Sequence, residues 1–134
     1  MKKFLVLVLF VLSFLNVNAQ EFLEPEDAFK VNIEKVDDNV NIKLVLGKDI
    51  YLYDDKIKVS IVKPQEFDIT EEVNIPEPTE YDGFIVQLND LDINIPVSLL
   101  KAKVDAKEYE IKLDYQGCSK QGLCYAPMNN SETI

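Results

Sequence analysis

Histidine, arginine and tryptophan are all absent from the 134 residues of the chain, so every basic side chain is a lysine. Without histidine the chain cannot form a Ser-His-Asp triad or a Cys-His pair, and it cannot bind zinc or haem through an imidazole. The 14 lysines face 24 acidic residues, which gives a formal net charge of −10. This charge argues against a nucleic-acid partner, because binding to phosphates requires a cationic face. Apolar residues make up 47% of the chain, as is typical of a globular protein.

The first nineteen residues have the features of an export signal. Lys2 and Lys3 precede a nearly uniform apolar stretch, Phe4–Leu15, and small residues follow at Val17–Ala19. The apolar stretch is too short to cross a hydrocarbon core of about 30 Å as a helix. An uncleaved N-terminal anchor is the alternative. We therefore predict a signal peptide over residues 1–19 and one exported domain over residues 20–134.

Apolar and polar residues alternate with a period of two in five segments. Such alternation indicates strands with one buried and one solvated face. Beyond a possible turn near Glu26–Phe29, the sequence has no convincing helical periodicity. The pattern predicts an all-β antiparallel protein with two packed sheets, since a single open sheet would leave its apolar face in water. The five predicted strands are Phe29–Ile33, Val40–Leu46, Ile57–Ile61, Leu91–Val97 and Tyr109–Tyr115.

The longest segment without alternation runs from Asn74 to Gly83. Its two prolines stiffen the backbone, and Gly83 permits a positive φ angle at its end. We predict a surface loop that carries one aromatic side chain, Tyr81. An ordinary connection between strands of a sandwich is the alternative.

An acidic segment, Asp90–Asn94, begins like a calcium-binding loop. Ile95 nevertheless stands where the turn glycine of such a loop belongs, and Lys101 stands where its bidentate glutamate should be. The apolar residues between the acidic ones suit a strand, so we predict a strand with a solvated acidic face and no metal site.

The remaining chemistry lies in two cysteines, Cys118 and Cys124, which an exported protein normally holds oxidised or uses for redox reactions. Their spacing matches neither zinc ribbons nor thioredoxin-like C-x-x-C motifs, and two thiolates alone make a poor metal site. A disulfide between them would close a local hairpin and contribute about 2 kcal/mol. Gly117 and Gly122 would leave room for another protein to approach. On these grounds a structural staple and an exchange-active bridge both remain open.

Nothing near the cysteines activates them strongly. Lys120 is the only cation in the loop between them. An unperturbed thiol with a pKa near 8.5 is only about 3% ionised at neutral pH. If the bridge exchanges, the oxidised form is therefore the one attacked, by a thiolate of the partner, and the intermediate is a mixed disulfide.

Three segments of the sequence carry specific motifs. The first, Tyr115–Pro127, is long and has the pattern Y-Q-G-C-x5-C-Y-x-P. The other two are Tyr51–Ile57, a Y-L-Y segment that enters a strand, and Pro25–Phe29, a P-x-x-A-F opening. Together the three segments extend from Pro25 to about Met128, which is nearly all of the mature chain. In these motifs the chain resembles the N-terminal periplasmic domain of the bacterial thiol:disulfide interchange protein DsbD.

The resemblance implies an immunoglobulin-like β-sandwich with the two cysteines on a hairpin at one end. It also implies that Cys118 and Cys124 form a reversible, redox-active disulfide and that no other cofactor takes part. Cys124 would form the mixed disulfides, and Cys118 would be its resolving partner.

A cap loop that shields the disulfide is a further implication of the resemblance. Alignment on Gly83 places it at Thr79, Glu80, Tyr81, Asp82 and Gly83, with Tyr81 at the position of a family phenylalanine. The cap motif differs from the family's D-E-F-Y-G, so either Tyr81 or Phe84 is the covering aromatic. Tyr51 and Tyr53 would shape the site, although their alternation also fits packing within a strand.

The implied partners are other redox proteins of the periplasm. A thioredoxin-like C-terminal domain of the same protein, fed through a membrane domain, would donate electrons. Periplasmic disulfide isomerases and cytochrome c maturation thioredoxins would accept them, and the activity would be that of a protein-disulfide reductase. The family continues into a transmembrane domain, so the chain is expected to be either a fragment or a free-standing homologue. The competing hypothesis is an exported binding or adhesion module whose disulfide is purely structural.

Overall fold

The computed structural model describes residues 21–134, so the predicted signal peptide lies outside the described residues. Within this range, no helix has both the length and the apolar character needed to cross a membrane. Most of the chain forms antiparallel strands, with two short α-helices and two 3-10 turns between them. In chain order the elements are α2 (Pro25–Ala28), β1 (Phe29–Val36), β2 (Asn39–Leu46), β3 (Ile50–Tyr53), η2 (Asp54–Lys56), β4 (Lys58–Lys63), β5 (Phe67–Asp68), η3 (Thr70–Glu72), β6 (Thr79–Tyr81), β7 (Phe84–Gln87), β8 (Leu91–Pro96), α3 (Val97–Lys103), β9 (Glu110–Tyr115), β10 (Gly117–Ser119) and β11 (Met128–Thr133).

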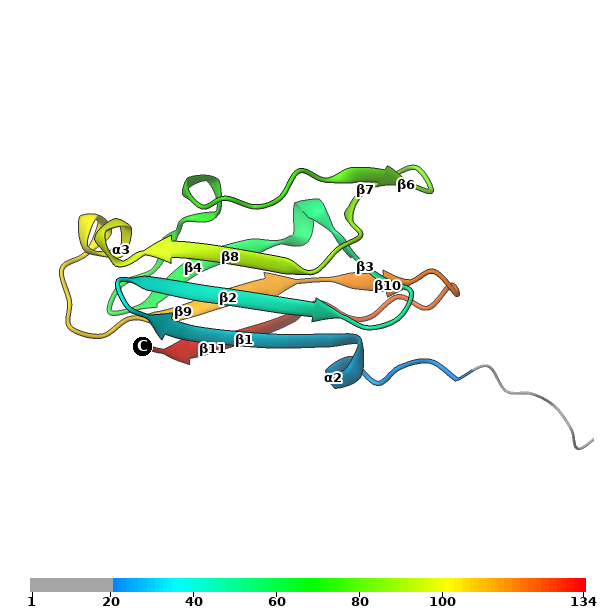
Figure 1. Cartoon of the computed structure of the whole chain (residues 1–134), viewed down its shortest axis with the longest axis horizontal. Coiled ribbons are helices and arrows are strands. Elements are labelled where there is room, and N and C mark those ends of the chain that lie inside the picture. Colours follow the sequence, from blue (N-terminus) through cyan, green and yellow to red (C-terminus); the bar gives the residue numbers. More distant parts are fainter. Residues whose placement is uncertain (1–20) are drawn as a thin grey trace, which may run out of the picture.

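Two antiparallel sheets pack face to face and form the body of the molecule (Figure 1). One has the strand order β1-β2-β8 and the other β11-β9-β4-β5. Alternate side chains of these strands point into the space between the sheets and are almost completely buried, as the period-two pattern requires. The predicted all-β, immunoglobulin-like sandwich and its five main strands are therefore confirmed. The inward residues include Val40, Ile42, Leu44, Val59, Ile61, Leu91, Ile93, Ile95, Ile111 and Leu113.

One helix was not predicted. Val97 was assigned to the end of a strand, but it is the first residue of α3, which follows Pro96. The helix has seven residues and buries only Leu100 fully. Fewer than two turns with one buried position produce no visible 3.6-residue repeat, so the sequence pattern could not reveal it.

The acidic segment is a strand, as predicted. In β8, Leu91, Ile93 and Ile95 are buried and the residues between them are exposed. The amide of Asn41 on the neighbouring strand β2 donates hydrogen bonds to Asp92 Oδ1 (2.6 Å) and Asn94 Oδ1 (2.9 Å). These contacts tie the polar face of β8 to its neighbour.

A third, smaller sheet extends one end of the sandwich and has the order β10-β3-β7-β6 (Figure 1). Its register places Cys118 of β10 opposite Tyr51 of β3, and Tyr53 of β3 opposite Val86 of β7. The backbone amide of Tyr53 also donates to the Gln116 carbonyl (2.9 Å). The sheet therefore brings the Y-L-Y segment, the first cysteine and residues after Gly83 together at one end of the molecule.

The predicted surface loop is wrong at its C-terminal end, because Thr79–Tyr81 form strand β6. This strand pairs with β7 across the two-residue turn Asp82-Gly83, with Tyr81 opposite Phe84. Both turn residues have positive φ angles, 51° and 81°. Hairpins favour turns of this kind because their twist matches that of the two strands, and Asp-Gly suits them because both residues tolerate a positive φ angle. The Asp-Gly pair before an apolar run was the signal for this hairpin.

Candidate functional site

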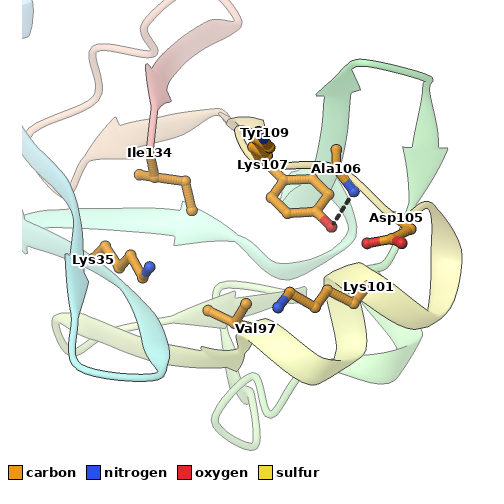
Figure 2. A pocket seen from close by; sticks show the side chains of 8 residues that line it. All are labelled: Lys35, Val97, Lys101, Asp105, Ala106, Lys107, Tyr109 and Ile134. Atoms are coloured by element: carbon orange, nitrogen blue, oxygen red, sulfur yellow. Dashed lines mark hydrogen bonds between the residues drawn. The ribbon is translucent and has the colours of Figure 1, made fainter.

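A cavity of about 530 Å³ is lined in part by residues of α3 (Figure 2). Helix α3 lies at the end of the sandwich opposite β10, which carries Cys118 (Figure 1). Three lysines, Lys35, Lys101 and Lys107, line it together with Asp105. The Tyr109 hydroxyl accepts a hydrogen bond from the Ala106 amide there (3.2 Å). None of the residues predicted to form the site lines this cavity.

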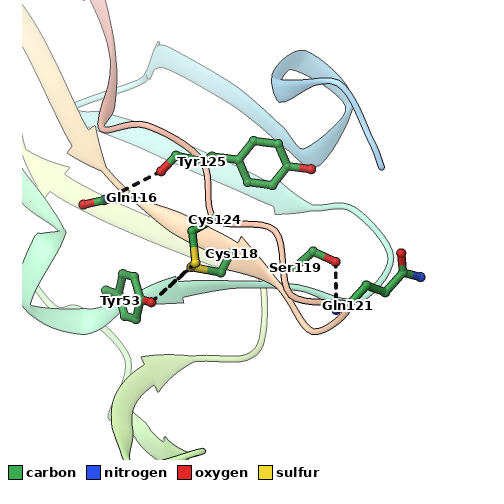
Figure 3. The surroundings of a disulfide bond; sticks show 7 residues. All are labelled: Tyr53, Gln116, Cys118, Ser119, Gln121, Cys124 and Tyr125. Atoms are coloured by element: carbon green, nitrogen blue, oxygen red, sulfur yellow. Dashed lines mark hydrogen bonds between the residues drawn. A yellow bond between two sulfur atoms is a disulfide. The ribbon is translucent and has the colours of Figure 1, made fainter. Parts of the chain in front are cut away.

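The candidate site is the hairpin that carries Cys118 and Cys124, which form a disulfide (Figure 3). Cys118 lies on β10, and the chain returns after a tight turn so that the two cysteines are antiparallel bridge partners. The Ser119 amide donates to the Leu123 carbonyl (2.7 Å) and closes the turn. Gly122 has a φ angle of 106°, which glycine adopts without steric cost. The disulfide thus braces one local hairpin and joins no distant strands.

The two sulfur-bearing residues differ in exposure. Cys118 is only 1% exposed, whereas Cys124 lies on the solvent side of the turn and is exposed. Thiol-disulfide exchange requires a thiolate to reach one sulfur while the other leaves. Of the two cysteines, Cys124 is therefore the one that an incoming thiolate reaches more readily, and Cys118 is in the position of the leaving group.

Cys118 belongs to a small apolar cluster that is separate from the main core. Aromatic rings dominate it: the Tyr51 ring centroid lies 6.0 Å from that of Tyr53 and 5.2 Å from that of Tyr81, and Tyr53 lies 5.5 Å from Phe84. Both candidate aromatics of the β6–β7 hairpin therefore contact the tyrosine pair of β3. The cluster consists of Tyr51, Val86 and Cys118, with Tyr53, Tyr81 and Leu88 packed against it.

The remaining predicted cap residues are more exposed than Tyr81. Thr79, Glu80, Asp82 and Gly83 are exposed, and no hydrogen bond joins any of their side chains to the cysteines in the described part of the chain. Tyr81 is the residue of this set that packs against the cluster containing Cys118.

Lys120, the cation of the cysteine loop, contacts the hairpin rather than a sulfur. Its Nζ atom lies 5.3 Å from the centroid of the Tyr81 ring, within the range of a cation–π interaction. The contact joins the loop between the two cysteines to the hairpin that carries Tyr81.

The hydroxyl group of Tyr53 is directed at the disulfide (Figure 3). It lies 3.1 Å from Cys118 Sγ and 3.8 Å from Cys124 Sγ. The sulfurs of a disulfide carry no proton, so the hydroxyl is the donor in both contacts. Next to it, burial and then the proximity of Tyr53 raise the pKa of the Tyr51 hydroxyl. Tyr51 therefore stays neutral at any working pH below its ordinary pKa of about 10.

The base of the cysteine hairpin is anchored by close packing. Tyr125 follows Cys124, packs edge-on against the ring of Phe29 (5.2 Å between centroids) and donates a hydrogen bond to the Leu23 carbonyl (2.7 Å). Burial raises the pKa of the Tyr125 hydroxyl, so it remains a donor. The Gln116 side-chain amide donates to the Tyr125 carbonyl (3.2 Å).

Gly117 has a different role from the one predicted. A Cβ atom at this position would lie 2.9 Å from two carbons of the Phe29 ring and closer still to the Tyr51 carbonyl oxygen. The glycine therefore permits close packing inside the molecule, and the prediction that it leaves room for a partner is wrong. Gly122, with no atom within 4 Å of such a Cβ, lies at the open end of the hairpin.

One positioning residue was missed in the sequence. Gln87 is buried, and its side-chain amide donates to Asp54 Oδ1 (2.9 Å) and to the Pro76 carbonyl (2.6 Å). These bonds join β7 to the turn after β3 and to the segment before β6. The only sequence signal was a polar residue at the end of an apolar run, which is not specific. Among residues 21–134, no group of three or more Asp, Glu, Cys or His side chains is arranged to hold a metal ion.

Comparisons with known proteins place these features in a family. Residues 19–134 match the family model described as the N-terminal region of the thiol:disulfide interchange protein DsbD. A DsbD protein of Campylobacter jejuni is 35% identical over 123 residues, which are 92% of this chain and 20% of that protein. One from Neisseria meningitidis is 28% identical over 119 residues, or 88% of this chain and 19% of that protein. The chain thus spans about a fifth of the length of these relatives.

Two solved structures have a similar fold. The crystal structure of the Neisseria meningitidis DsbD N-terminal domain in the reduced form has a TM-score of 0.65 and 28% identity, and the match covers 88% of this chain and 93% of that one. A structure of the complex between the DsbD and PilB N-terminal domains from Neisseria meningitidis has a TM-score of 0.61 and 25% identity, with coverage of 88% and 91%.

Proposed function

Because the chain belongs to the family of DsbD N-terminal domains, we propose that it passes electrons between periplasmic proteins through reversible reduction of the Cys118–Cys124 disulfide. The donor would be a thioredoxin-like domain, as in the C-terminal part of DsbD. The acceptors would be oxidised disulfide isomerases and cytochrome c maturation thioredoxins. The similar structure that contains a PilB N-terminal domain supports a protein as exchange partner.

Each transfer consists of two exchange steps. A donor thiolate attacks Cys124 Sγ, the intramolecular S–S bond breaks, and Cys118 leaves as a thiolate. The second thiol of the donor then attacks the mixed disulfide, which leaves the donor oxidised and both cysteines of this domain reduced. Toward an acceptor the two exchange steps run in reverse. Cys124 attacks the disulfide of the acceptor, and Cys118 then attacks Cys124 Sγ and releases the reduced acceptor. The observation that carries this assignment is the exposure of Cys124 beside a buried Cys118.

The proposal extends to the whole protein. We propose that residues 1–19 direct export and are removed, that residues 20–134 form the redox domain, and that the domain works in the periplasm. Reductase activity toward the acceptors would require the donor, and any attachment to the membrane would come from a transmembrane domain such as the one present in the family. The domain itself would need no cofactor beyond its two cysteines.

Equilibration with glutathione distinguishes this function from a purely structural disulfide. Structural disulfides of secreted proteins have reduction potentials below about −300 mV, whereas exchange-active ones lie higher. We expect the purified domain to be partly reduced across mixtures of reduced and oxidised glutathione, as measured by thiol alkylation and mass spectrometry. A bridge that stays fully oxidised in every mixture, and that no thioredoxin-like protein reduces, would instead support a binding or adhesion module.

We further propose that the β6–β7 hairpin acts as a cap that restricts access to the disulfide. Tyr81 holds it in place through the Tyr51 ring (5.2 Å between centroids) and the Lys120 amine (5.3 Å). An aromatic pair and an exposed cation–π contact are each worth about 1 kcal/mol. Their combined loss, about 2 kcal/mol, would raise the fraction of molecules with an open cap by roughly 30-fold.

Tyr81→Ala is accordingly expected to speed reduction of the disulfide by small thiols by up to about 30-fold. The measurement is the rate of reduction by dithiothreitol, followed by alkylation of quenched samples. Tyr81→Phe is the matched control, because it keeps the ring and both ring contacts and should react at close to the original rate. Equal rates for Tyr81→Ala and the unmodified domain would eliminate the cap proposal.

A further inference from the structure

We propose that Tyr53 is a catalytic residue whose hydroxyl group stabilises Cys118 as a thiolate when the disulfide opens. The proposal rests on the proposed exchange function and adds a chemical role for a residue of β3. Its starting point is geometric: the Tyr53 oxygen lies 3.1 Å from Cys118 Sγ and 3.8 Å from Cys124 Sγ. The hydroxyl is therefore nearer to the sulfur that leaves than to the sulfur that is attacked.

The leaving sulfur needs such a donor because of its surroundings. Cys118 is 1% exposed and packs with Tyr51 and Val86, so water cannot solvate a charge on its sulfur. Burial without a donor raises the pKa of a thiol, and a thiol of higher pKa leaves more slowly. An unassisted Cys118 would thus be a poor leaving group.

Two side-chain types that commonly stabilise a thiolate are missing from the sequence, and the lysine between the cysteines contacts another group. The chain has neither histidine nor arginine. The amine of Lys120 lies against the face of the Tyr81 ring. Among the side chains of residues 21–134, the group that the structure places within hydrogen-bonding distance of Cys118 Sγ is the Tyr53 hydroxyl.

The ring of Tyr53 is held in position by its neighbours. Its centroid lies 6.0 Å from that of Tyr51, and these two rings are nearly perpendicular (87°). The centroid of Phe84 lies 5.5 Å away, and the angle between those two ring planes is 61°. The backbone amide of Tyr53 is bonded to the Gln116 carbonyl, two residues before Cys118. The donor is therefore in place before the reaction begins, and little reorganisation is needed as charge develops.

The chemical step balances without any further reactant. An incoming thiolate forms a bond to Cys124 Sγ, the bond between the two sulfurs breaks, and the electron pair of that bond stays on Cys118. The Tyr53 O–H donates a hydrogen bond to the resulting thiolate and keeps its proton. In the reverse step the same hydrogen bond keeps Cys118 ionised, so that it can attack the mixed disulfide at Cys124.

Tyr53→Phe tests the proposal, because it removes the hydroxyl and keeps the ring contacts. We expect reduction by dithiothreitol to slow by about tenfold or more, the value of one hydrogen bond to a charged group. The direction is informative: looser packing around the disulfide would speed the reaction, whereas loss of the donor slows it. Tyr115→Phe is the matched control, because Tyr115 is also a strand tyrosine and its hydroxyl donates to Asn130 Oδ1 (2.7 Å) instead of a sulfur.

A second measurement does not depend on any exchange reaction. In the Cys124→Ala variant the single thiol of Cys118 is titrated through the thiolate absorbance near 240 nm. Addition of Tyr53→Phe should raise the pKa of the Cys118 thiol by about one unit, while Tyr115→Phe should not change it.

The possible outcomes separate this proposal from the proposed function. An unchanged reduction rate and an unchanged thiol pKa in Tyr53→Phe would overturn the role of Tyr53, even if the domain exchanges disulfides with a thioredoxin-like partner. If no such partner reacts with the unmodified domain, the proposed function fails. A raised pKa and slower reduction by dithiothreitol would still support the role of Tyr53 in opening the bond.

Discussion

Cys124→Ala is expected to abolish disulfide exchange, and Cys118→Ala is expected to accumulate a mixed disulfide. Cys124 is exposed and Cys118 is 1% exposed, so we expect partners to form their covalent adduct with Cys124. Without Cys118 the adduct has no internal thiol to resolve it and persists. The measurement uses an oxidised thioredoxin-like domain as partner, with acid quenching, alkylation and non-reducing electrophoresis. Mass analysis of the adduct identifies the cysteine that carries the partner.

The two variants control for each other, because each removes one sulfur from the same hairpin. The backbone bonds of the turn, such as that from the Ser119 amide to the Leu123 carbonyl, remain in both. An adduct from Cys124→Ala through Cys118 would reverse the assignment of the two roles. If neither variant forms an adduct while the unmodified domain is also inert, the bridge is structural.

Gly117→Ala is expected to have the largest effect on stability, with a loss of about 3 kcal/mol or more from the free energy of unfolding. The added Cβ would overlap the Tyr51 carbonyl and would lie 2.9 Å from the Phe29 ring. Both neighbours are buried, and the Tyr51 oxygen belongs to backbone that pairs with β10, so neither can move freely. Relief of the clash requires displacement of β10 and therefore of Cys118. Urea denaturation followed by circular dichroism measures the change.

Gly83→Ala is the matched glycine-to-alanine control. Its φ angle of 81° makes alanine unfavourable, but a Cβ there would meet no atom within 4 Å. We expect the cost to be about 1–2 kcal/mol, the usual penalty for a left-handed conformation. A loss in Gly117→Ala no larger than that in Gly83→Ala would mean that β10 and Tyr51 separate easily, and the close packing inferred here would be wrong.

The long strands could be predicted because their pattern has a simple physical cause. In β2 and β8, burial of every second side chain between two sheets requires apolar residues at Val40, Ile42, Leu91 and Ile93. Each of these strands has six or more residues, long enough for alternation to be visible. The cysteine hairpin could also be predicted, since two cysteines six positions apart can only brace a local turn.

The short elements could not be predicted in the same way. Strands β5, β6 and β10 have two or three residues, too few to display a period. Strand β11 (Met128–Thr133) is almost entirely exposed and therefore has no apolar face to detect. These strands are specified by pairing with a neighbour, such as β9 for β11, and a pairing partner distant in sequence is not encoded in local composition.

The sequence by itself determined the β-sandwich, the cysteine hairpin and the exclusion of histidine chemistry, because alternation, spacing and composition are local properties. Only the tertiary structure decided which sulfur faces solvent and which side chain donates to the other. Residues 53, 81 and 118 meet because β3, the β6–β7 hairpin and β10 pair in one sheet. Exposure and hydrogen-bonding distance arise from that assembly of distant segments, and the chemistry of the disulfide depends on both.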